Sequence, residues 1–427
     1  MKAIKMPSIE QSNLWHHSAE NLFLSSPHDG HLAVDVVVIG GGYTGLSAAL
    51  HLSEAGIKTC VLEADSIGHG GSGRNVGLVN TGLWTPPDVI ERRTGSTAGK
   101  KLNTILASGP SLVFDLIEKH QIPCEHVRCG TLHCAAGYLG LKELDSRFRQ
   151  QRKRNAPVQL LSAEETARRT GTHQFVGSLF DERAGTIQPN AYAHGLAHAA
   201  ENAGARIFQS TPAVSISKAN GHWNVKTPNG TVVGQKLVQA TNAYGIGGVT
   251  KNQFTPAYYF QSATQPLPKE LRQKILPGGE GCWDTATIMS SFRMDKAGRL
   301  LIGGVGNLEN FGGKLHHGWA HRKMRSLFPE LSNVELEYVW GGRIAVTNDH
   351  LPKIVEFGDG AISIFGYSGR GIAPGTIFGR SVADWFVNDD PSAFPVEFQP
   401  CSREPLKGTK SFFYEAGATL FHMVTER

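Results

Sequence analysis

Cysteine is scarce in this chain. Six cysteines are spread over 427 residues, and no two of them form a C-x-x-C pair. This usage fits neither a disulfide framework nor a zinc site, because Cys124, Cys129 and Cys134 stand at a five-residue spacing that matches no common ligand pattern. The pair His16-His17 has no acidic or thiol partner at metal spacing. We therefore expect no metal site and a reducing compartment.

Long apolar runs are also missing. No uninterrupted run approaches the roughly 20 residues of a membrane span, and residues 1–31 lack the apolar stretch of a signal peptide. The apolar stretch at residues 412–424 is too short to span and carries Glu415, so a packed tail or a homodimer contact is expected rather than an interfacial anchor. We expect a protein without a membrane span, located in the cytoplasm.

Neither positive nor negative charge is in large excess in this chain. The net charge is only +5, and the one dense basic run, residues 147–154, is more typical of a solvated helix face than of a surface for an acidic partner. No nucleic-acid partner is expected.

Glycine, in contrast, is abundant and ordered. Residues 34–39 form an apolar, β-branched run typical of a strand buried on both faces. Gly40, Gly42 and Gly45 then follow at G-x-G-x-x-G spacing, and residues 46–56 read as a helix. These glycines allow a tight turn, the approach of a pyrophosphate and close helix packing, with the helix N-terminus facing the phosphates. The pattern predicts a dinucleotide site, although a plain glycine turn in an α/β domain is the alternative.

An acid closes the next predicted strand. Residues 58–63 read as a strand that ends in Glu63, 18 residues after Gly45, where a carboxylate can accept hydrogen bonds from a ribose. Its charge disfavours the 2′-phosphate of NADP, but NAD and FAD both remain open at this point.

The glycine-rich segment 68–78 distinguishes FAD from NAD. It contains Ser72-Gly73-Arg74-Asn75-Val76-Gly77-Leu78, and with the fingerprint it resembles the "SGRN-x-G" turn of the D-amino-acid-oxidase-like FAD oxidoreductases, in which this turn lies along the flavin and pyrophosphate. Val76 departs from the Asn-Gly-Gly continuation that is commoner in that family. The resemblance covers roughly residues 33–390 and implies FAD as the cofactor.

The resemblance also implies the other cofactor contacts. A second glycine loop, residues 366–375, lies between a predicted strand at 361–365 and a predicted helix at 376–387, and in the family it meets the pyrimidine end of the flavin. Arg370 replaces the histidine common in related loops. The residues expected to bind FAD are Gly40, Gly42, Tyr43, Thr44, Gly45, Glu63, Ser72, Gly73, Arg74, Asn75, Val76, Gly77, Leu78, Val214, Thr241, Gly369, Gly371, Ile372 and Ala373.

A chain of this length exceeds one core, so two domains are expected. The expected fold class is α/β. A Rossmann-like FAD-binding domain of the GR2 type is assembled from residues 32–90, 155–250 and 340–390, and an antiparallel β-sheet substrate domain with helices from 91–154 and 251–339. An extended arm (1–31) and a C-terminal tail (391–427) complete the chain. Periodicity predicts amphipathic helices up to about residue 120, a strand over 123–136, a helix over 142–155 and a hairpin turn at 295–298.

One arginine stands out for the substrate. The segment 340–352 resembles the family pattern "G-x-R-P-x-T-x-D-x-x-P", in which the arginine pairs with an amino-acid carboxylate beside the flavin. Arg343 is therefore the expected carboxylate ligand, with Ile344 in place of proline, and a surface or core-bridging arginine is the alternative. Because this segment contains no cysteine, FAD is expected to be held without a covalent bond.

The resemblance implies FAD-dependent oxidation of a C–N bond to an imine by hydride transfer to flavin N5. The expected substrate is a secondary or cyclic amino acid, L-pipecolate-like, and the alternative is a polyamine derivative such as gamma-glutamylputrescine. The acceptor is O2 or an electron-transfer partner. Two further hypotheses stay open: a flavin reductase fed by NADH or NADPH, for which residues 100–360 contain no second fingerprint, and a protein that holds inert flavin.

Overall fold

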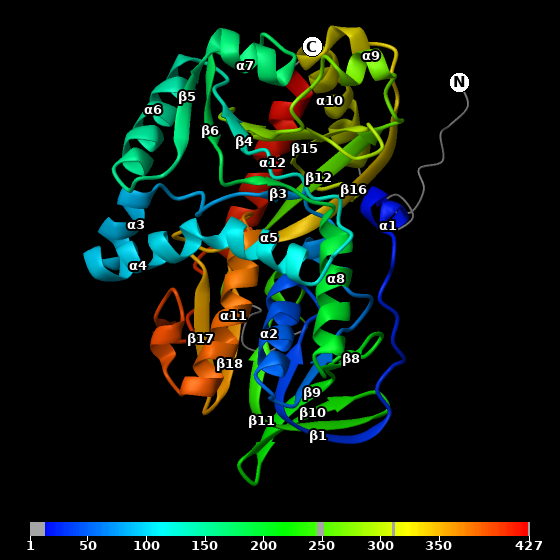
Figure 1. Cartoon of the computed structure of the whole chain (residues 1–427), viewed down its shortest axis with the longest axis vertical. Coiled ribbons are helices and arrows are strands. Elements are labelled where there is room, and N and C mark those ends of the chain that lie inside the picture. The colour runs from blue at the N-terminus through cyan, green and yellow to red at the C-terminus, as the bar shows by residue number, and fades with distance from the viewer. Residues whose placement is uncertain (1–12, 246–251, 310–311, 426–427) are drawn as a thin grey trace.

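The computed structural model describes residues 13–245, 252–309 and 312–425. Two β-sheets lie one above the other along the long axis, and helices cover them (Figure 1). The predicted α/β class is confirmed. Residues 1–12 of the expected N-terminal arm lie outside the described residues.

The lower sheet has nine strands and a parallel centre in the order β18-β11-β1-β2-β8. β17 pairs antiparallel with β18 and parallel with β19, while β9 and β10 form an antiparallel extension of β11. The strands of this sheet are β1 (Gly30–Ile39), β2 (Thr59–Leu62), β8 (Arg206–Phe208), β9 (Ser215–Ala219), β10 (His222–Thr227), β11 (Gly230–Gln239), β17 (Lys353–Gly358), β18 (Ala361–Phe365) and β19 (Phe398–Gln399).

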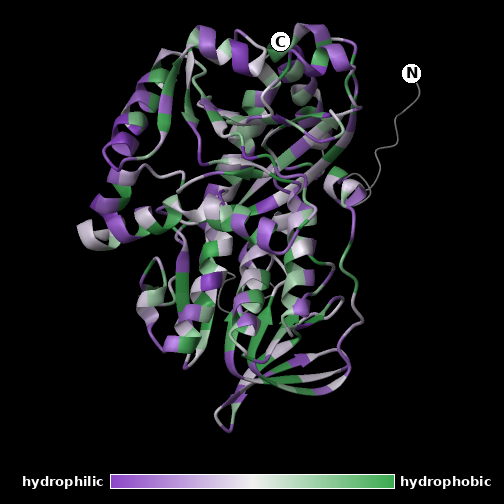
Figure 2. Cartoon of the chain, viewed as in Figure 1, coloured by the Kyte–Doolittle hydropathy of each residue, from purple (hydrophilic) through white to green (hydrophobic). Residues whose placement is uncertain are grey.

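The second half of strand β1, residues 36–39, is apolar and buried because both of its faces are covered. Val36 and Val38 pack with the helices α2 (Tyr43–Glu54), α8 (Pro189–Asn202) and α11 (Ile372–Asn388). Val37 packs on the other face with Trp223 of β10. Figure 2 shows the resulting concentration of hydrophobic residues in this part of the sheet. The strand, turn and helix predicted for residues 34–56 are therefore confirmed.

The upper sheet has eight strands in the order β16-β12-β15-β14-β13-β4-β6-β5. Neighbours are antiparallel except β13 and β4, which are parallel. Its strands are β4 (Thr131–Cys134), β5 (Val158–Ser162), β6 (Gly177–Asp181), β12 (Thr255–Thr264), β13 (Gly281–Asp284), β14 (Ser290–Met294), β15 (Leu300–Val305) and β16 (Leu336–Val346). β5 and β6 belong to this sheet although they lie within 155–250, and the division into domains stays a prediction.

The remaining helices connect and cover these sheets. The amphipathic helices predicted up to about residue 120 are present, and the helix predicted over 142–155 is α6, which begins and ends earlier. They are α3 (Pro87–Thr94), α4 (Ser96–Ala107), α5 (Gly109–Lys119), α6 (Tyr138–Arg152), α7 (Ala163–Thr170), α9 (Lys269–Arg272) and α10 (Gly312–Leu327). β3 (Leu78–Val79) and β7 (Gly185–Thr186) form a separate two-stranded sheet.

The strand expected over 123–136 is shorter than predicted. Only residues 131–134 pair in the sheet as β4, because Glu125 has a positive φ of 50° and Val127 makes just an isolated bridge to Thr186. The hairpin turn at 295–298 is confirmed, since the Gly298 N–H donates to the Asp295 carbonyl at 3.0 Å between β14 and β15.

Both terminal segments are packed where the structure describes them. The expected arm contains a short helix, α1 (Leu14–Ser18), and its Trp15 is fully buried with its ring centroid 5.9 Å from that of Trp340. The arm is therefore not simply extended. The C-terminal helix α12 (Lys407–Val424) buries Ala418 and His422 beside β12 and α10, while the homodimer stays a prediction. No helix among the described residues is both long and apolar enough for a membrane crossing.

Candidate functional site

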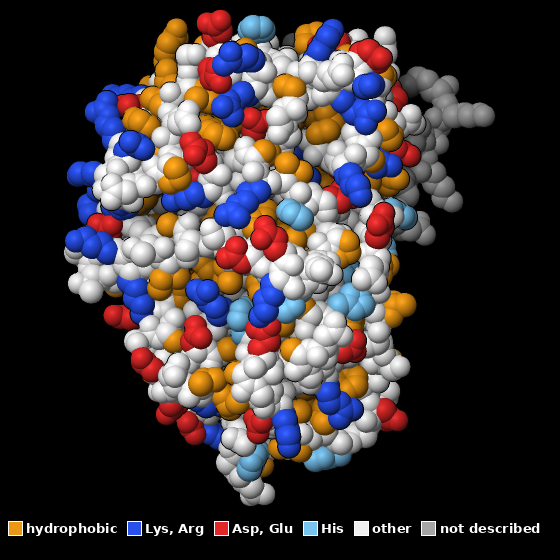
Figure 3. All heavy atoms as spheres, viewed as in Figure 1, with side chains coloured by type: hydrophobic (Ala, Val, Ile, Leu, Met, Phe, Trp, Pro, Cys, Tyr) orange, Lys and Arg blue, Asp and Glu red, His pale blue; other side chains and the backbone are white. Residues whose placement is uncertain are grey.

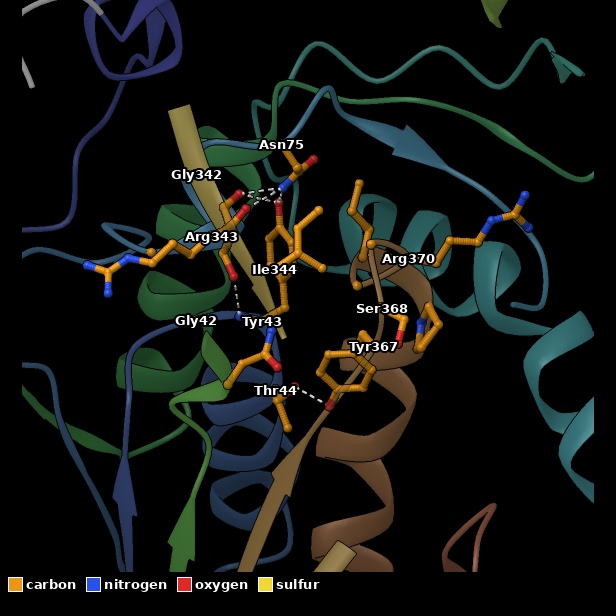
Figure 4. Close-up of a pocket in the computed structure, with 18 of the residues that line it drawn as sticks. Gly42, Tyr43, Thr44, Asn75, Gly342, Arg343, Ile344, Tyr367, Ser368 and Arg370 are labelled. Carbon is orange, nitrogen blue, oxygen red and sulfur yellow. Dashed lines mark hydrogen bonds between the residues drawn. The ribbon is translucent and has the colours of Figure 1, made fainter. Parts of the chain in front are cut away.

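A cavity of about 1050 Å³ lies between the two sheets. Its lower wall is the carboxyl end of β1, β2, β11 and β18, which is where ligands bind in open parallel sheets. Its upper wall is the face of the second sheet that carries Tyr259 and Ser291. Figure 4 shows part of this cavity, with side chains contributed by both glycine loops and by β16.

The fingerprint turn has no room for side chains. A Cβ on Gly40, whose φ is +113°, would lie 2.8 Å from the Ala240 oxygen, and a Cβ on Gly45 would lie 2.0 Å from the Gly40 oxygen. A Cβ on Gly42 would meet the Ser72 hydroxyl at 2.9 Å. The N-cap residue Gly42 has no side chain to cap α2, and the Tyr43 N–H donates to the Ser72 hydroxyl at 3.1 Å. The positive end of the helix dipole faces the cavity, where it suits a phosphate.

Glu63 is fixed at the end of β2. One carboxylate oxygen accepts from the Gly41 N–H at 2.6 Å and the other from the Asp65 N–H at 3.0 Å. Burial raises the pKa of this carboxyl, and the two hydrogen bonds act against that rise. A carboxylate oriented in this way beside the fingerprint turn suits the ribose of a dinucleotide.

The glycine-rich segment after Glu63 is held by its own polar side chains. The Asn75 amide donates to the carbonyls of Gly71 and Ser72, both at 2.9 Å, and its oxygen accepts from the Gly77 N–H at 2.8 Å. Arg74 donates through Nε to the His69 carbonyl at 2.6 Å. The predicted residues of this segment that line the cavity are Ser72, Arg74, Asn75, Val76 and Leu78.

The predicted glycines 73 and 77 lie behind the lining rather than in it. A Cβ on Gly77, which has a φ of +81°, would lie 2.2 Å from the Ile187 oxygen and 2.5 Å from the Arg293 guanidinium. Arg293 is an additional residue that the sequence did not indicate. Its buried guanidinium donates to the carbonyls of Ile187 at 2.6 Å and Gly77 at 3.3 Å, and burial lowers its pKa to about 10.

The N-terminal segment also supports this loop. The Trp15 indole donates to the Asn75 carbonyl at 2.8 Å, and the Asn13 amide donates to the Gly73 carbonyl at 3.0 Å. Nothing in the spacing of residues 13–18 indicated these contacts.

The second glycine loop meets the same cavity. Gly371 precedes α11 without a side-chain cap, and the cavity is lined by Gly369, Gly371, Ile372 and Ala373. The Tyr367 hydroxyl lies 2.7 Å from the Thr44 hydroxyl, which connects this loop to the fingerprint helix. The structure thus brings together the three glycine segments that the sequence identified.

Two other predicted contacts come from the strands between them. Thr241, directly after β11, lines the cavity. Val214 does not: its side chain is 66% exposed, although its neighbours Ala213 and Ile216 line the cavity.

Arg343 borders the cavity, but its side chain is exposed and follows the outer face of β16. In the pairing of β12 with β16, Arg343 is opposite Tyr258, whereas Ile344 is opposite Ala257. Successive strand residues point to opposite faces, so Ile344 points into the cavity and the Arg343 side chain points away from it. Figure 4 shows Arg343 directed away from Ile344 and Arg370, and the guanidinium lies 5.2 Å from the centre of the Tyr244 ring.

The register explains this difference from expectation. In the pattern G-x-R-P-x-T the arginine stands three residues before the threonine, and in this chain Ile344 stands three residues before Thr347. A shift of one residue turns a side chain to the other face of a sheet. The binding of a substrate carboxylate by Arg343 stays a prediction, and the geometry does not favour it.

Arg370 lies inside the cavity. Its guanidinium is 4.7 Å from the ring centre of Trp84 and 5.2 Å from that of Trp283, and it donates to the Thr81 carbonyl at 2.7 Å. Burial of the guanidinium lowers the pKa of Arg370 to about 9, and the positive charge of the neighbouring Arg147 is the second cause. Trp283 was not indicated by the sequence, since a single aromatic residue in a strand carries no distinguishing spacing.

Fold and cavity together define the class of this protein as a dinucleotide-binding oxidoreductase of the flavin type. The glycine turns without space for a Cβ, the oriented Glu63 and the two helix N-termini that face the cavity fit FAD.

Comparison with known proteins agrees with this class. The family described as "DAO: FAD dependent oxidoreductase" matches residues 35–385, and the chain belongs to this family. It is 30% identical over 364 residues to a probable oxidoreductase OrdL of Haemophilus influenzae, with 83% of each chain covered. It is 29% identical over 371 residues to the gamma-glutamylputrescine oxidoreductase of Escherichia coli, with 84% of each covered.

A solved structure shows the same fold. The glycine oxidase from Geobacillus kaustophilus superimposes with a TM-score of 0.69 at 19% sequence identity, covering 85% of this chain and 96% of that one. The protein is therefore an FAD-dependent oxidoreductase, and its family includes amine and amino-acid oxidases.

Proposed function

We propose that this protein oxidises the C–N bond of an extended amine to an imine, and that the substrate carries a carboxylate away from the reacting carbon, as gamma-glutamylputrescine does. The observation that carries this proposal is the register of β16. Both residues border the cavity, but the register points the Ile344 side chain inward and the exposed Arg343 side chain to the other face of the sheet, so the place where the family pattern has a carboxylate-binding arginine is apolar.

A secondary or cyclic amino acid, L-pipecolate-like, is the second candidate. Arg370 favours it, because this arginine supplies a cation in the same cavity. Both candidates share the chemistry at the reacting carbon and differ in how far the carboxylate lies from the amine.

When bound, FAD would supply the oxidation by accepting the α-hydrogen with the two electrons of its C–H bond, while the amine N–H proton would pass to solvent, and water would hydrolyse the imine that results. The protein residues bind and orient. Gly42, Glu63 and the N-termini of α2 and α11 hold the dinucleotide, while Tyr259, Trp84 and Ile344 provide an apolar wall that keeps water from the reacting carbon. No dedicated protein base is part of the proposal.

The acceptor and the compartment belong to the same proposal. Reduced flavin is expected to pass its electrons to O2 or to an electron-transfer partner, in the cytoplasm, where the six cysteines stay as the free thiols that the structure shows.

Anaerobic bleaching of the purified holoenzyme tests the function. Gamma-glutamylputrescine should bleach the flavin at 450 nm faster than L-pipecolate, L-proline or sarcosine at equal concentration, with putrescine as the control that lacks the carboxylate. Faster bleaching by pipecolate would select the second candidate. Bleaching by NADH alone would point to a flavin reductase, and no bleaching by any amine would contradict both candidates.

A further inference from the structure

A second cavity adjoins the first. It is a groove of about 880 Å³ between α3, α4 and α6, and it shares the five lining residues Asn80, Thr85, Arg147, Trp283 and Arg370 with the main cavity. The wall between the two cavities is therefore thin. Arg370 lies at this junction, between the rings of Trp84 and Trp283.

The groove has an excess of positive charge. Seven lysines and arginines line it against three acids. All three acids are already engaged: Asp88 and Glu91 pair with Arg154 at 2.7 and 2.6 Å, and Asp181 pairs with Arg183 at 2.7 Å. Figure 3 shows basic side chains along the same edge of the molecule, over α3, α4 and α6.

Arg370 and Arg147 are the basic side chains that reach the main cavity from this groove. Among the ion pairs of the described residues, none joins Arg370 to an acid, and its buried Nε makes no hydrogen bond. Arg147 uses its Nε for Glu143 at 2.9 Å, at the solvent side of α6. Both guanidinium groups line the junction, and Asp181, the acid whose charge acts on Arg370, already pairs with Arg183, so the space favours binding of an anion.

The environment of His133 supports this reading. Its ring stacks on Trp283 with centroids 4.9 Å apart. Burial, and then the charges of Arg147 and Arg370, lower its pKa well below the usual value. His133, held neutral, and Arg370 thus both contact Trp283 at the junction, and a carboxylate there would offset the repulsion between Arg370 and Arg147.

We infer that Arg370 and Arg147 form an anion subsite at the junction of the two cavities, which binds the carboxylate of the substrate while the amine lies in the main cavity. The inference rests on the proposed function for the amine, and it names the part of the cavity that selects substrates. Arg370, with its planar fork, is suited to a bidentate contact, and the groove gives the rest of an extended substrate room.

Equilibrium titration of the holoenzyme with benzoate and benzamide tests the subsite, because the two probes share shape and differ in charge. Binding is followed by the change in the flavin absorption spectrum. The parent should bind benzoate at least tenfold more tightly than benzamide. Arg370→Gln and Arg147→Gln should each weaken benzoate binding by about 10- to 100-fold and leave benzamide binding unchanged. Arg149→Gln, two residues further along α6 and 75% exposed, is the matched control.

Several results would overturn the inference. Equal affinity of the parent for benzoate and benzamide would overturn it. An equal loss of affinity for both probes in Arg370→Gln would also overturn it, because such a loss indicates a structural role. Loss of benzoate binding in Arg343→Gln alone would place the carboxylate on the other side of β16. If Arg370→Gln fails to retain FAD, the comparison of benzoate with benzamide in the parent and the benzoate affinity of Arg147→Gln decide whether the anion subsite exists.

The probe titration and the bleaching experiment, both done on the parent protein, distinguish a failure of this inference from a failure of the proposed function. Discrimination between benzoate and benzamide without bleaching by any amine would support the anion subsite and contradict the amine oxidation. Bleaching by amines without discrimination would do the reverse.

Discussion

The hydroxyl of Thr44 lies 2.7 Å from the hydroxyl of Tyr367, 323 residues further along the chain. Thr44 belongs to the first turn of α2 and Tyr367 to the loop before α11, so this hydrogen bond joins the two helix N-termini that face the cavity. Both side chains are buried, and burial raises the pKa of Tyr367, which keeps the phenol neutral.

Tyr367→Phe should therefore lower the free energy of unfolding by about 1–3 kcal/mol, because it leaves a buried hydroxyl on Thr44 without its partner. Chemical denaturation of the holoenzyme measures this loss. The double variant Thr44→Val with Tyr367→Phe should be less destabilised than the sum of the single variants, and strict additivity would show that the two hydroxyls do not interact.

Glu63→Ala should weaken FAD binding by about 1.5–3 kcal/mol while leaving the fold intact, since it removes a charged acceptor for the ribose. The dissociation constant of FAD for the apoprotein measures the effect, and circular dichroism checks the fold. Glu164→Ala, an exposed acid on α7, is the control. Unchanged FAD affinity in Glu63→Ala would mean that this carboxylate only fixes the turn through its bonds to the Gly41 and Asp65 N–H groups.

FAD should leave the protein on acid precipitation. None of the six cysteines lines the main cavity: Cys282 is fully buried in the second sheet and Cys401 is exposed near the C-terminus. Absorbance of the supernatant at 450 nm measures the released flavin. Yellow colour that stays with the washed precipitate would indicate a covalent bond.

Arg293→Met should destabilise the protein by about 2–4 kcal/mol, because the buried guanidinium donates to the carbonyls of Ile187 and Gly77 and a methionine cannot. Since Gly77 belongs to the glycine-rich segment, loss of bound FAD should accompany the loss of stability. Denaturation midpoints and the ratio of flavin to protein measure the two effects. Arg149→Met is the surface control, and an equal effect of both variants would contradict the role of Arg293.

The stability of the protein should fall as the pH falls below about 6.5. The Nδ1 atoms of His316 and His422 lie 2.7 Å apart under α12. Burial lowers the pKa of His316 to about 4 and that of His422 to about 3. The unfolded chain therefore binds more protons than the folded one between these values and about 6.5, and each histidine lowers the free energy of unfolding by up to about 1.4 kcal/mol per pH unit there.

Denaturation of the parent and of His422→Leu at pH 7.5 and pH 5 measures this dependence. The difference between the two pH values should be smaller in His422→Leu, because one depressed histidine is gone. His31→Gln, at an exposed position, should keep the parental difference. An unchanged difference in His422→Leu would show that the histidine pair does not contribute to the pH dependence of stability.

Local sequence determined the dinucleotide turn. The apolar run at 34–39, the glycines at 40, 42 and 45 and the acid at 63 all belong to one strand–helix–strand unit over residues 34–63, so local chain geometry places them around one turn. The same holds for most of the segment 68–78, where the Asn75 side chain bonds to Gly71, Ser72 and Gly77, although its amide also donates to the distant Tyr43 hydroxyl at 3.1 Å. Motifs of this kind require no knowledge of the tertiary fold.

Tertiary structure alone decided which arginine enters the cavity. Arg343 and Ile344 are neighbours in sequence, and only the pairing of β16 with β12 turns one outward and the other inward, since a strand alternates its faces at every residue. Arg370 meets Trp84 and Trp283 because three distant segments end at the same point between the sheets. No spacing in the sequence encodes such contacts, which arise when the two sheets pack against each other.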